Sequence, residues 1–127
     1  AIVVSLATLM SDGTPQVQPV WCSFDGTHIL VNTEKDTQKY RNLSRRRVAT
    51  ILAIDPDDDN RWLEVRGTVA EETEEGAREH LDELTQLYLE VDTYPYHQEG
   101  DVCVLFRIAP QRVTTLELTM PGVSTSN

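Results

Sequence analysis

The 127-residue chain is poor in several residue types, and each shortage argues against a class of protein. It has two cysteines, Cys22 and Cys103, and neither belongs to a CxxC pair, so we expect free thiols rather than a zinc site or a disulfide scaffold. The histidines, His28, His80 and His97, show no HxH or HxxxH spacing, which predicts no metal site. No apolar run approaches the roughly 18 residues of a membrane span, and no signal peptide is recognisable.

Basic residues are also scarce, with 11 Lys and Arg against 21 Asp and Glu, and the net charge is −10. This balance argues against binding to nucleic acids or to anionic membranes, because both need clustered cations. The basic residues are unevenly placed, however. Six of them lie between positions 35 and 47, beside a single acidic residue: Lys35, Lys39, Arg41, Arg45, Arg46 and Arg47. This cationic segment indicates either a site for a small anionic ligand or a solvated helix face.

Motifs for several kinds of catalysis are absent. There is no GxSxG elbow for a serine nucleophile, and Cys22 has no basic neighbour in sequence to activate its thiol, so a hydrolase is not supported. There is no glycine-rich phosphate loop either. One anion site remains possible where Asn32 and Thr33 end a predicted strand and Thr37 begins a predicted helix. The free N–H groups and dipole of a helix start favour an anion, which Lys39 can also reach.

Short apolar runs separated by turn residues predict strands over residues 2–9, 16–24, 28–33, 48–54 and 62–70. A longer strand or pair of strands follows over 102–118, interrupted at Pro110. The turn at 11–14 and the Asp25-Gly26 hairpin signal join the first three strands in antiparallel order. Residues 55–60 form an acidic loop in this prediction, and Leu63, Val65, Gly67 and Val69 of the strand that follows are expected to face inward.

Two helices are predicted between the strands. A short one begins after Asp36 or Thr37. A long one covers residues 74–90, with Thr73 as its N-cap and His80 on its solvent side, and its apolar stripe is Ala77, Leu81, Leu84, Tyr88 and Val91. The predicted fold is mainly β: a single domain over 1–127, built as a small split or closed barrel of six to seven antiparallel strands. We expect residues 119–127 to form a loose tail and the natural N-terminal segment to precede residue 1.

The order of several motifs resembles a known family. The motifs are L-A-T-L before D-G-T-P-Q, the F-D-G hairpin, K-Y-R-N-L before V-A-T-I-L, W-L-E-V-R-G and Y-P-Y-H-Q-E-G. Together they cover nearly all of positions 4–117. They resemble the pyridoxamine 5'-phosphate oxidase-like, FMN-binding split barrels, and more narrowly the branch that uses the deazaflavin coenzyme F420.

The resemblance implies a homodimer with flavin-like cofactors in the grooves between the subunits. Lys39, the first residue of K-Y-R-N-L, matches the position that binds the cofactor phosphate or anionic tail. Trp62 matches a position that reaches the cofactor from the partner subunit. Arg41 fits the motif either as a cofactor ligand or as a structural residue. The full set of implied cofactor-binding positions is Pro15, Gln16, Pro19, Asn32, Thr33, Lys39, Arg41 and Trp62.

The implied function is that of a cytoplasmic oxidoreductase in which reduced F420 transfers hydride to a small organic substrate. No dedicated catalytic side chain is expected, because the cofactor carries that chemistry and the protein orients it. Two alternatives remain open: an FMN-dependent oxidase or reductase of the same fold, and a non-catalytic carrier of a flavin, F420 or haem-like ligand. Tyr94, Tyr96 and His97 either wall a substrate pocket or pack structurally.

Overall fold

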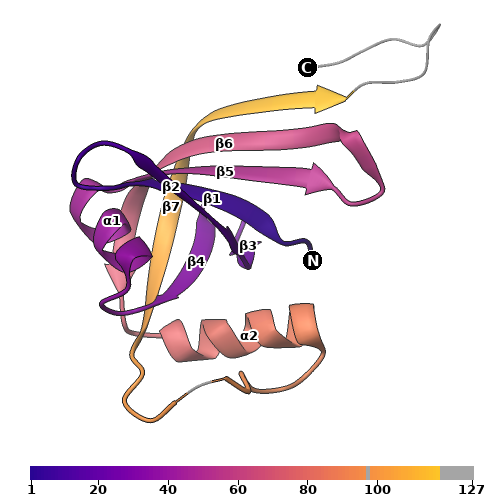
Figure 1. Ribbon diagram of the computed structural model, residues 1–127. Helices are drawn as coiled ribbons and strands as arrows, with labels where there is room; N and C mark the ends of the chain where they lie inside the picture. The colour runs from indigo at the N-terminus through magenta and orange to yellow at the C-terminus, as the bar shows by residue number, and fades with distance from the viewer. Residues whose placement is uncertain (97, 118–127) are drawn as a thin grey trace, which may run out of the picture.

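The protein folds as a single antiparallel sheet that curls around its own core (Figure 1). The computed structural model describes residues 1–96 and 98–117. The sheet has seven strands in the order β2-β1-β5-β6-β7-β4-β3. Their bounds are β1 Val4–Leu9, β2 Pro15–Val20, β3 Cys22–Phe24, β4 Ile29–Glu34, β5 Val48–Asp55, β6 Asp58–Thr73 and β7 Cys103–Glu117. The predicted mainly β split barrel is confirmed.

The long strands β6 and β7 give the sheet its curvature. Their register shifts between Arg66 and Gly67 and again between Val69 and Glu71, and such irregularities bend and twist a strand pair. Gly67 of β6 lies where the backbones of β6 and β7 come close together. A Cβ atom there would be 2.6 Å from the carbonyl oxygen of Ala109, so only glycine permits the two backbones to approach this closely.

Helix α1, Gln38–Arg46, closes one side of the barrel. Thr37 is its N-cap, as one of the two predicted caps, and its Oγ1 accepts a hydrogen bond from the N–H of Tyr40 at 3.2 Å. The helix buries Leu43 completely in the main core, beside Val31, Phe106 and Ile108. Packing of these side chains fixes the orientation of α1, and therefore the direction in which its first turn points.

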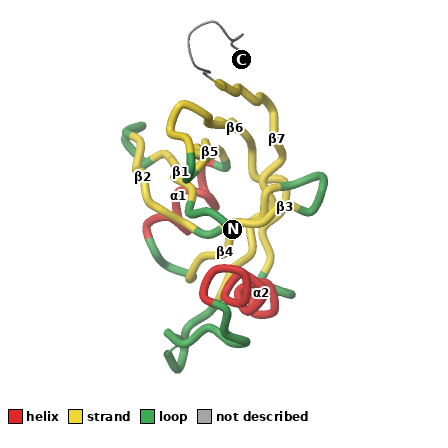
Figure 2. Tube along the Cα trace, turned by 90° about the vertical axis from the view of Figure 1, so that its right-hand side faces the viewer, coloured by secondary structure: helices red, strands yellow, loops and turns green. Residues whose placement is uncertain are grey.

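Helix α2, Ala77–Leu89, lies next to β4, below the strands in both views (Figures 1 and 2). A second, smaller core forms there from Leu30, Ala77, Cys103 and Leu105. Both cysteines are free thiols, as predicted. In the described part of the chain, neither helix has the length and apolar character needed to span a membrane.

Three strand predictions were wrong in detail. The predicted strand over 16–24 is two strands, because β2 pairs with β1 whereas β3 pairs with β4. The chain passes from one edge of the sheet to the other at Trp21. The predicted acidic loop over 55–60 is a tight turn at 56–57, since β6 already begins at Asp58 and pairs with Asp55. Leu63 was expected to face inward but is 37% exposed.

The predicted long helix was also wrong in three respects. It starts at Ala77 rather than at 74, and its N-cap is Gly76, while Thr73 Oγ1 instead accepts from the N–H of Glu75. It ends at Leu89, so Val91 lies beyond it and is exposed. His80 is buried, with 5% of its surface exposed, and does not face solvent. The predicted tail over 119–127 and His97 lie outside the described residues.

Candidate ligand-binding groove

A groove lies between α2, the first turn of α1 and strand β2, beside the end of β4. It consists of two adjoining cavities of about 330 and 440 Å³. Both cavities are lined by Asn32, Lys39, Leu81 and Tyr94. The first is completed mainly by polar side chains, among them Gln18, Thr33, Glu34 and Thr37. The second is completed mainly by apolar and aromatic side chains, among them Pro19, Trp21 and Tyr96. The groove therefore has a polar end and an aromatic end.

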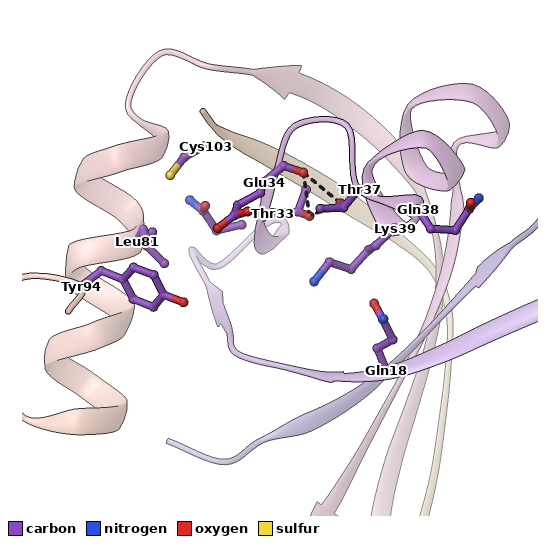
Figure 3. Close-up of a pocket in the computed structure, with 10 residues that line it drawn as sticks. Gln18, Thr33, Glu34, Thr37, Gln38, Lys39, Leu81, Tyr94 and Cys103 are labelled. Atoms are coloured by element: carbon purple, nitrogen blue, oxygen red, sulfur yellow. Dashed lines mark hydrogen bonds between the residues drawn. The ribbon is translucent and has the colours of Figure 1, made fainter. Parts of the chain in front are cut away.

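Lys39 connects the two ends. It lies in the first turn of α1, and Figure 3 shows its amine pointing into the space between Gln18 and Tyr94. Burial lowers the pKa of Lys39, and the charge of Glu34 offsets part of that effect. Across residues 1–96 and 98–117, the Lys39 amine has no hydrogen-bond or ion-pair partner. A partly desolvated cation without a partner is costly, so this position favours binding of an anion.

The threonines beside Lys39 hold the turn that carries it. Thr37 Oγ1 donates to the carbonyl oxygen of Glu34 at 2.9 Å, and it lies 3.3 Å from Thr33 Oγ1 (Figure 3). Thr33 is buried at the end of β4. Both hydroxyls are thus engaged in connecting β4 to α1. These bonds fix the start of α1 and therefore place Lys39, two residues after Thr37, at the groove.

The wall of the groove that faces Lys39 is aromatic. Trp21 stacks on Tyr88 with ring centroids 5.1 Å apart, and it meets Tyr94 edge-on at 6.3 Å. Tyr94 in turn meets Tyr96 edge-on at 5.5 Å. The N–H of Tyr94 donates to the carboxylate of Asp82 on α2, at 3.1 Å, which ties this loop to the helix. A planar ring can stack against such a surface.

The Tyr94 hydroxyl adds a polar group to this aromatic wall. Burial raises the pKa of Tyr94, as do nearby acidic groups including Glu34. The phenol therefore keeps its proton and remains a hydrogen-bond donor at neutral pH.

Asn32 joins the groove to α2. Its side-chain nitrogen donates to the carbonyl oxygen of Ala77 at 2.6 Å and lies 3.3 Å from His80 Nδ1. The other imidazole nitrogen, His80 Nε2, lies 2.9 Å from the hydroxyl of Ser23. Burial, with a smaller effect of Arg107, lowers the pKa of His80 to about 4, so the imidazole is neutral at pH 7.

Four of the eight residues that the family resemblance implied line the groove: Pro19, Asn32, Thr33 and Lys39. Pro15 is exposed where β2 begins, and neither it nor Gln16 lines the groove. Gln16 Oε1 instead accepts from the amide of buried Asn42 at 3.3 Å. The guanidinium of Arg41 donates to the carbonyl oxygen of Asp36 at 2.6 Å, so within one chain Arg41 stabilises the start of α1.

Trp62 lies apart from this group. It is on β6, opposite Ile54 and Leu116, and lines a separate cavity of about 400 Å³. Within one chain it does not meet the groove residues. Its predicted contact with a cofactor depends on a partner subunit, and it stays a prediction.

The residues of the cationic segment, 35–47, have different partners in the folded chain. Lys35 pairs with Glu74 at 3.2 Å, and Arg47 pairs with Glu72 at 3.6 Å. The guanidinium of Arg46 donates to the carbonyl oxygen of Leu9 and to Asn42. Among the described residues that line the groove, Lys39 is the one Lys or Arg. Most of the segment is therefore bonded within the chain, one of its cations faces a cavity, and an anion site at Lys39 stays a prediction.

Sequence reasoning missed several lining residues. Gln18 follows Gln16 by two positions on β2, so strand alternation places it on the same face, and this signal was available. Leu81 was assigned to the core and Cys103 only to a strand. Both help form the small core under α2 and also line the groove. Within the described residues, no cluster of three His, Cys, Asp or Glu side chains is placed to bind a metal ion.

Comparison with known proteins places this geometry in a family. The sequence model described as pyridoxamine 5'-phosphate oxidase matches residues 1–117. No curated protein sequence matches the chain. Among solved structures, an F420 reductase is 30% identical over 89% of each chain, with a TM-score of 0.78.

Other solved structures share the fold at lower identity. A conserved hypothetical protein from Mycobacterium tuberculosis is 24% identical, over 98% of this chain and 85% of its own, with a TM-score of 0.73. The haem storage protein of Vibrio cholerae is 18% identical, over 88% of this chain and 84% of its own, with a TM-score of 0.66. Because the family model spans 1–117 and the F420 reductase is 30% identical, the chain belongs to the pyridoxamine 5'-phosphate oxidase family.

Proposed function

We propose that the protein is an oxidoreductase that binds coenzyme F420 in the groove and reduces a small organic substrate. The observation that carries this proposal is the half-buried amine of Lys39, which has no partner among residues 1–96 and 98–117 and lies between a polar and an aromatic cavity. The F420 reductase at 30% identity supports the choice of coenzyme.

The residues present fit a ligand that combines a planar ring with an anionic tail. Lys39 supplies the charge for a phosphate, and the polar end around Gln18 and Thr37 has room for the groups attached to it. Trp21 and Tyr94 supply the aromatic surface for a ring. When bound, reduced F420 supplies a hydride. The chain's own contribution is to orient the ring, hold the tail and keep a protonated Tyr94 hydroxyl in the cavity.

FMN is the second candidate, and one observation favours it. A long polyanionic tail needs several cations, and Arg46 and Arg47 are bonded elsewhere in the chain. Lys39 alone suffices for the single phosphate of FMN. The third candidate, a carrier without turnover, fits the same groove and is distinguished by the absence of substrate-dependent oxidation of the bound cofactor.

We further propose that the protein is a homodimer. The sheet carries exposed apolar side chains, with Phe24 63%, Leu63 37% and Val113 56% exposed, around an apolar cavity of about 510 Å³. Such surfaces on a small protein mark interfaces. The cavity lined by Trp62 shares Leu63 with this surface, which supports the prediction that Trp62 reaches a partner subunit.

Light scattering tests the homodimer. We expect a mass of twice the 14.4 kDa of the chain, and we expect Leu63→Glu to shift it to the monomer mass. The exposed Leu87 on α2 lies outside the apolar cavity, so Leu87→Glu is the matched control and should remain a dimer. A monomeric wild-type protein would contradict the proposal.

Fluorescence titration with F420 and, separately, with FMN tests the proposed cofactor. Tighter binding of F420, followed by oxidation of reduced F420 on addition of an organic electron acceptor, supports the leading proposal. Tighter binding of FMN moves the protein to the flavin-dependent alternative. Binding without any acceptor-dependent oxidation indicates a carrier, and binding of neither ligand would refute a cofactor function for the groove.

A further inference from the structure

His80 is buried beneath the groove, although nothing in the proposed chemistry uses it. It lies on α2 with 5% of its surface exposed, and both of its ring nitrogens have partners. The imidazole connects Ser23 on β3 to Asn32 on β4. Asn32 also lines both cavities of the groove, so a ligand that contacts Asn32 there would be linked to His80 through that side chain.

The hydrogen bonds of Asn32 determine which imidazole nitrogen carries the proton. The atom of Asn32 that lies 2.6 Å from the carbonyl oxygen of Ala77 must be the amide nitrogen, since two oxygens at that distance would repel. The same nitrogen lies 3.3 Å from His80 Nδ1. Nδ1 must therefore accept, and in a neutral imidazole the proton is then on Nε2, which donates to the Ser23 hydroxyl at 2.9 Å.

This arrangement leaves the carbonyl oxygen of the Asn32 side chain without a partner among the described residues. All buried side-chain nitrogen and oxygen atoms of the described residues do have partners. The Asn32 oxygen is therefore accessible rather than buried, and the space that Asn32 lines is the groove, where Lys39 also lies. The groove thus offers a cation together with a fixed hydrogen-bond acceptor.

We propose that His80 is a positioning residue for ligand binding, because its neutral imidazole holds the Asn32 amide with its oxygen toward the groove. There the oxygen accepts a hydrogen bond from a hydroxyl or N–H group of the ligand whose anionic group Lys39 binds. The ligand class is a phosphate ester that carries hydroxyl groups, a description that includes both FMN and F420. This inference rests on the proposed function, since it takes the groove as the cofactor site.

Two substitutions of His80 separate positioning from simple filling of space. An asparagine side chain places its amide near the position of His80 Nδ1, whereas glutamine places its amide near Nε2. His80→Asn therefore keeps an acceptor for Asn32, and His80→Gln keeps only the contact with Ser23. We expect His80→Gln to weaken binding of the tighter ligand, FMN or F420, about fivefold, the effect of one neutral hydrogen bond. His80→Asn should stay within about twofold of wild type.

Asn32→Ala supplies the second arm of this experiment. It should weaken binding to a similar extent, and adding His80→Gln to Asn32→Ala should cause no further loss, because His80 acts through Asn32. Equal loss of affinity in His80→Gln and His80→Asn would overturn the proposal. The proposal would also be overturned if the double variant lost affinity by the product of the two single losses. Melting temperatures of all variants identify those that fail to fold.

The tautomer is tested without any ligand. Nitrogen-15 NMR of the His80 side chain at pH 7 should show a proton on Nε2 and none on Nδ1. A proton on Nδ1 would refute the proposal even if the groove binds F420 tightly. Conversely, failure of the wild-type protein to bind FMN or F420 would refute the proposed function, while the tautomer still reports whether His80 fixes Asn32.

Discussion

Replacing Lys39 by methionine separates ligand binding from folding more sharply than any other change in this chain. Methionine keeps most of the length of the lysine stem but removes the charge. In the ligand-free protein that charge has no partner among the described residues, and burial lowers its pKa. Removing it therefore relieves a desolvation cost and breaks no bond, so the melting temperature of Lys39→Met should equal or slightly exceed that of wild type.

Ligand binding should respond in the opposite way. A hydrogen bond between an ammonium group and a phosphate contributes about 1.5–3 kcal/mol, so Lys39→Met should weaken binding roughly 10- to 150-fold. Fluorescence titration at two salt concentrations measures this loss. The wild-type affinity should fall as salt rises, and the affinity of Lys39→Met should fall less, because one charge pair has been removed from the complex.

Lys35→Met is the matched control for this experiment. Lys35 belongs to the same cationic segment but is exposed and paired with Glu74 at 3.2 Å, outside the groove. Its substitution should leave the affinity within about twofold of wild type, as expected for an exposed ion pair remote from the ligand. Unchanged affinity in Lys39→Met, or an equal loss in Lys35→Met, would show that the segment acts as a diffuse charge and that Lys39 is not a ligand contact.

Two further predictions concern stability. The pKa of His80 falls from 6.5 to about 4 on folding, so between these pH values the unfolded chain binds a proton that the folded chain does not. The free energy of unfolding should therefore fall by about 2–3 kcal/mol between pH 7 and pH 4, and urea titrations should show a smaller fall in His80→Gln. Asn42→Ala should cost about 2–4 kcal/mol in the same assay, since its fully buried amide bonds Thr8, Gln38 and Arg46; a cost below 1 kcal/mol would contradict this.

Strands with local turn signals could be predicted from the sequence, whereas partners distant in the chain could not. The Asp25-Gly26 turn and the apolar run within residues 28–33 identified the hairpin that became β3 and β4. The break at Trp21 has only a weak local signal, Pro19, because Val20 and Cys22 on either side of Trp21 fit a continuous strand. It arises because β2 and β3 pair with different strands and lie at opposite edges of the sheet.

In the candidate site, too, local features could be predicted from the sequence and contacts between distant residues could not. Lys39 and Asn32 were identified from a motif and from a strand end, which are local features. Which cations of the segment face the groove depends on the salt bridges and carbonyl contacts that Arg46 and Arg47 make with distant residues. His80 was predicted to face solvent, although its spacing from the apolar residues of α2 indicates the buried face. It lies three residues after Ala77 and four before Leu84, on the buried face, and its polar character outweighed that spacing.

A crystal structure of the protein with F420 bound would test the central claim most directly. We expect an anionic group of the ligand within roughly 2.7–3.2 Å of the Lys39 amine, and a ring against Trp21 and Tyr94. We also expect a ligand hydroxyl or N–H group bonded to the side-chain oxygen of Asn32. A ligand bound instead in the apolar cavity beside Leu63, with the Lys39 amine still unpaired, would contradict the account.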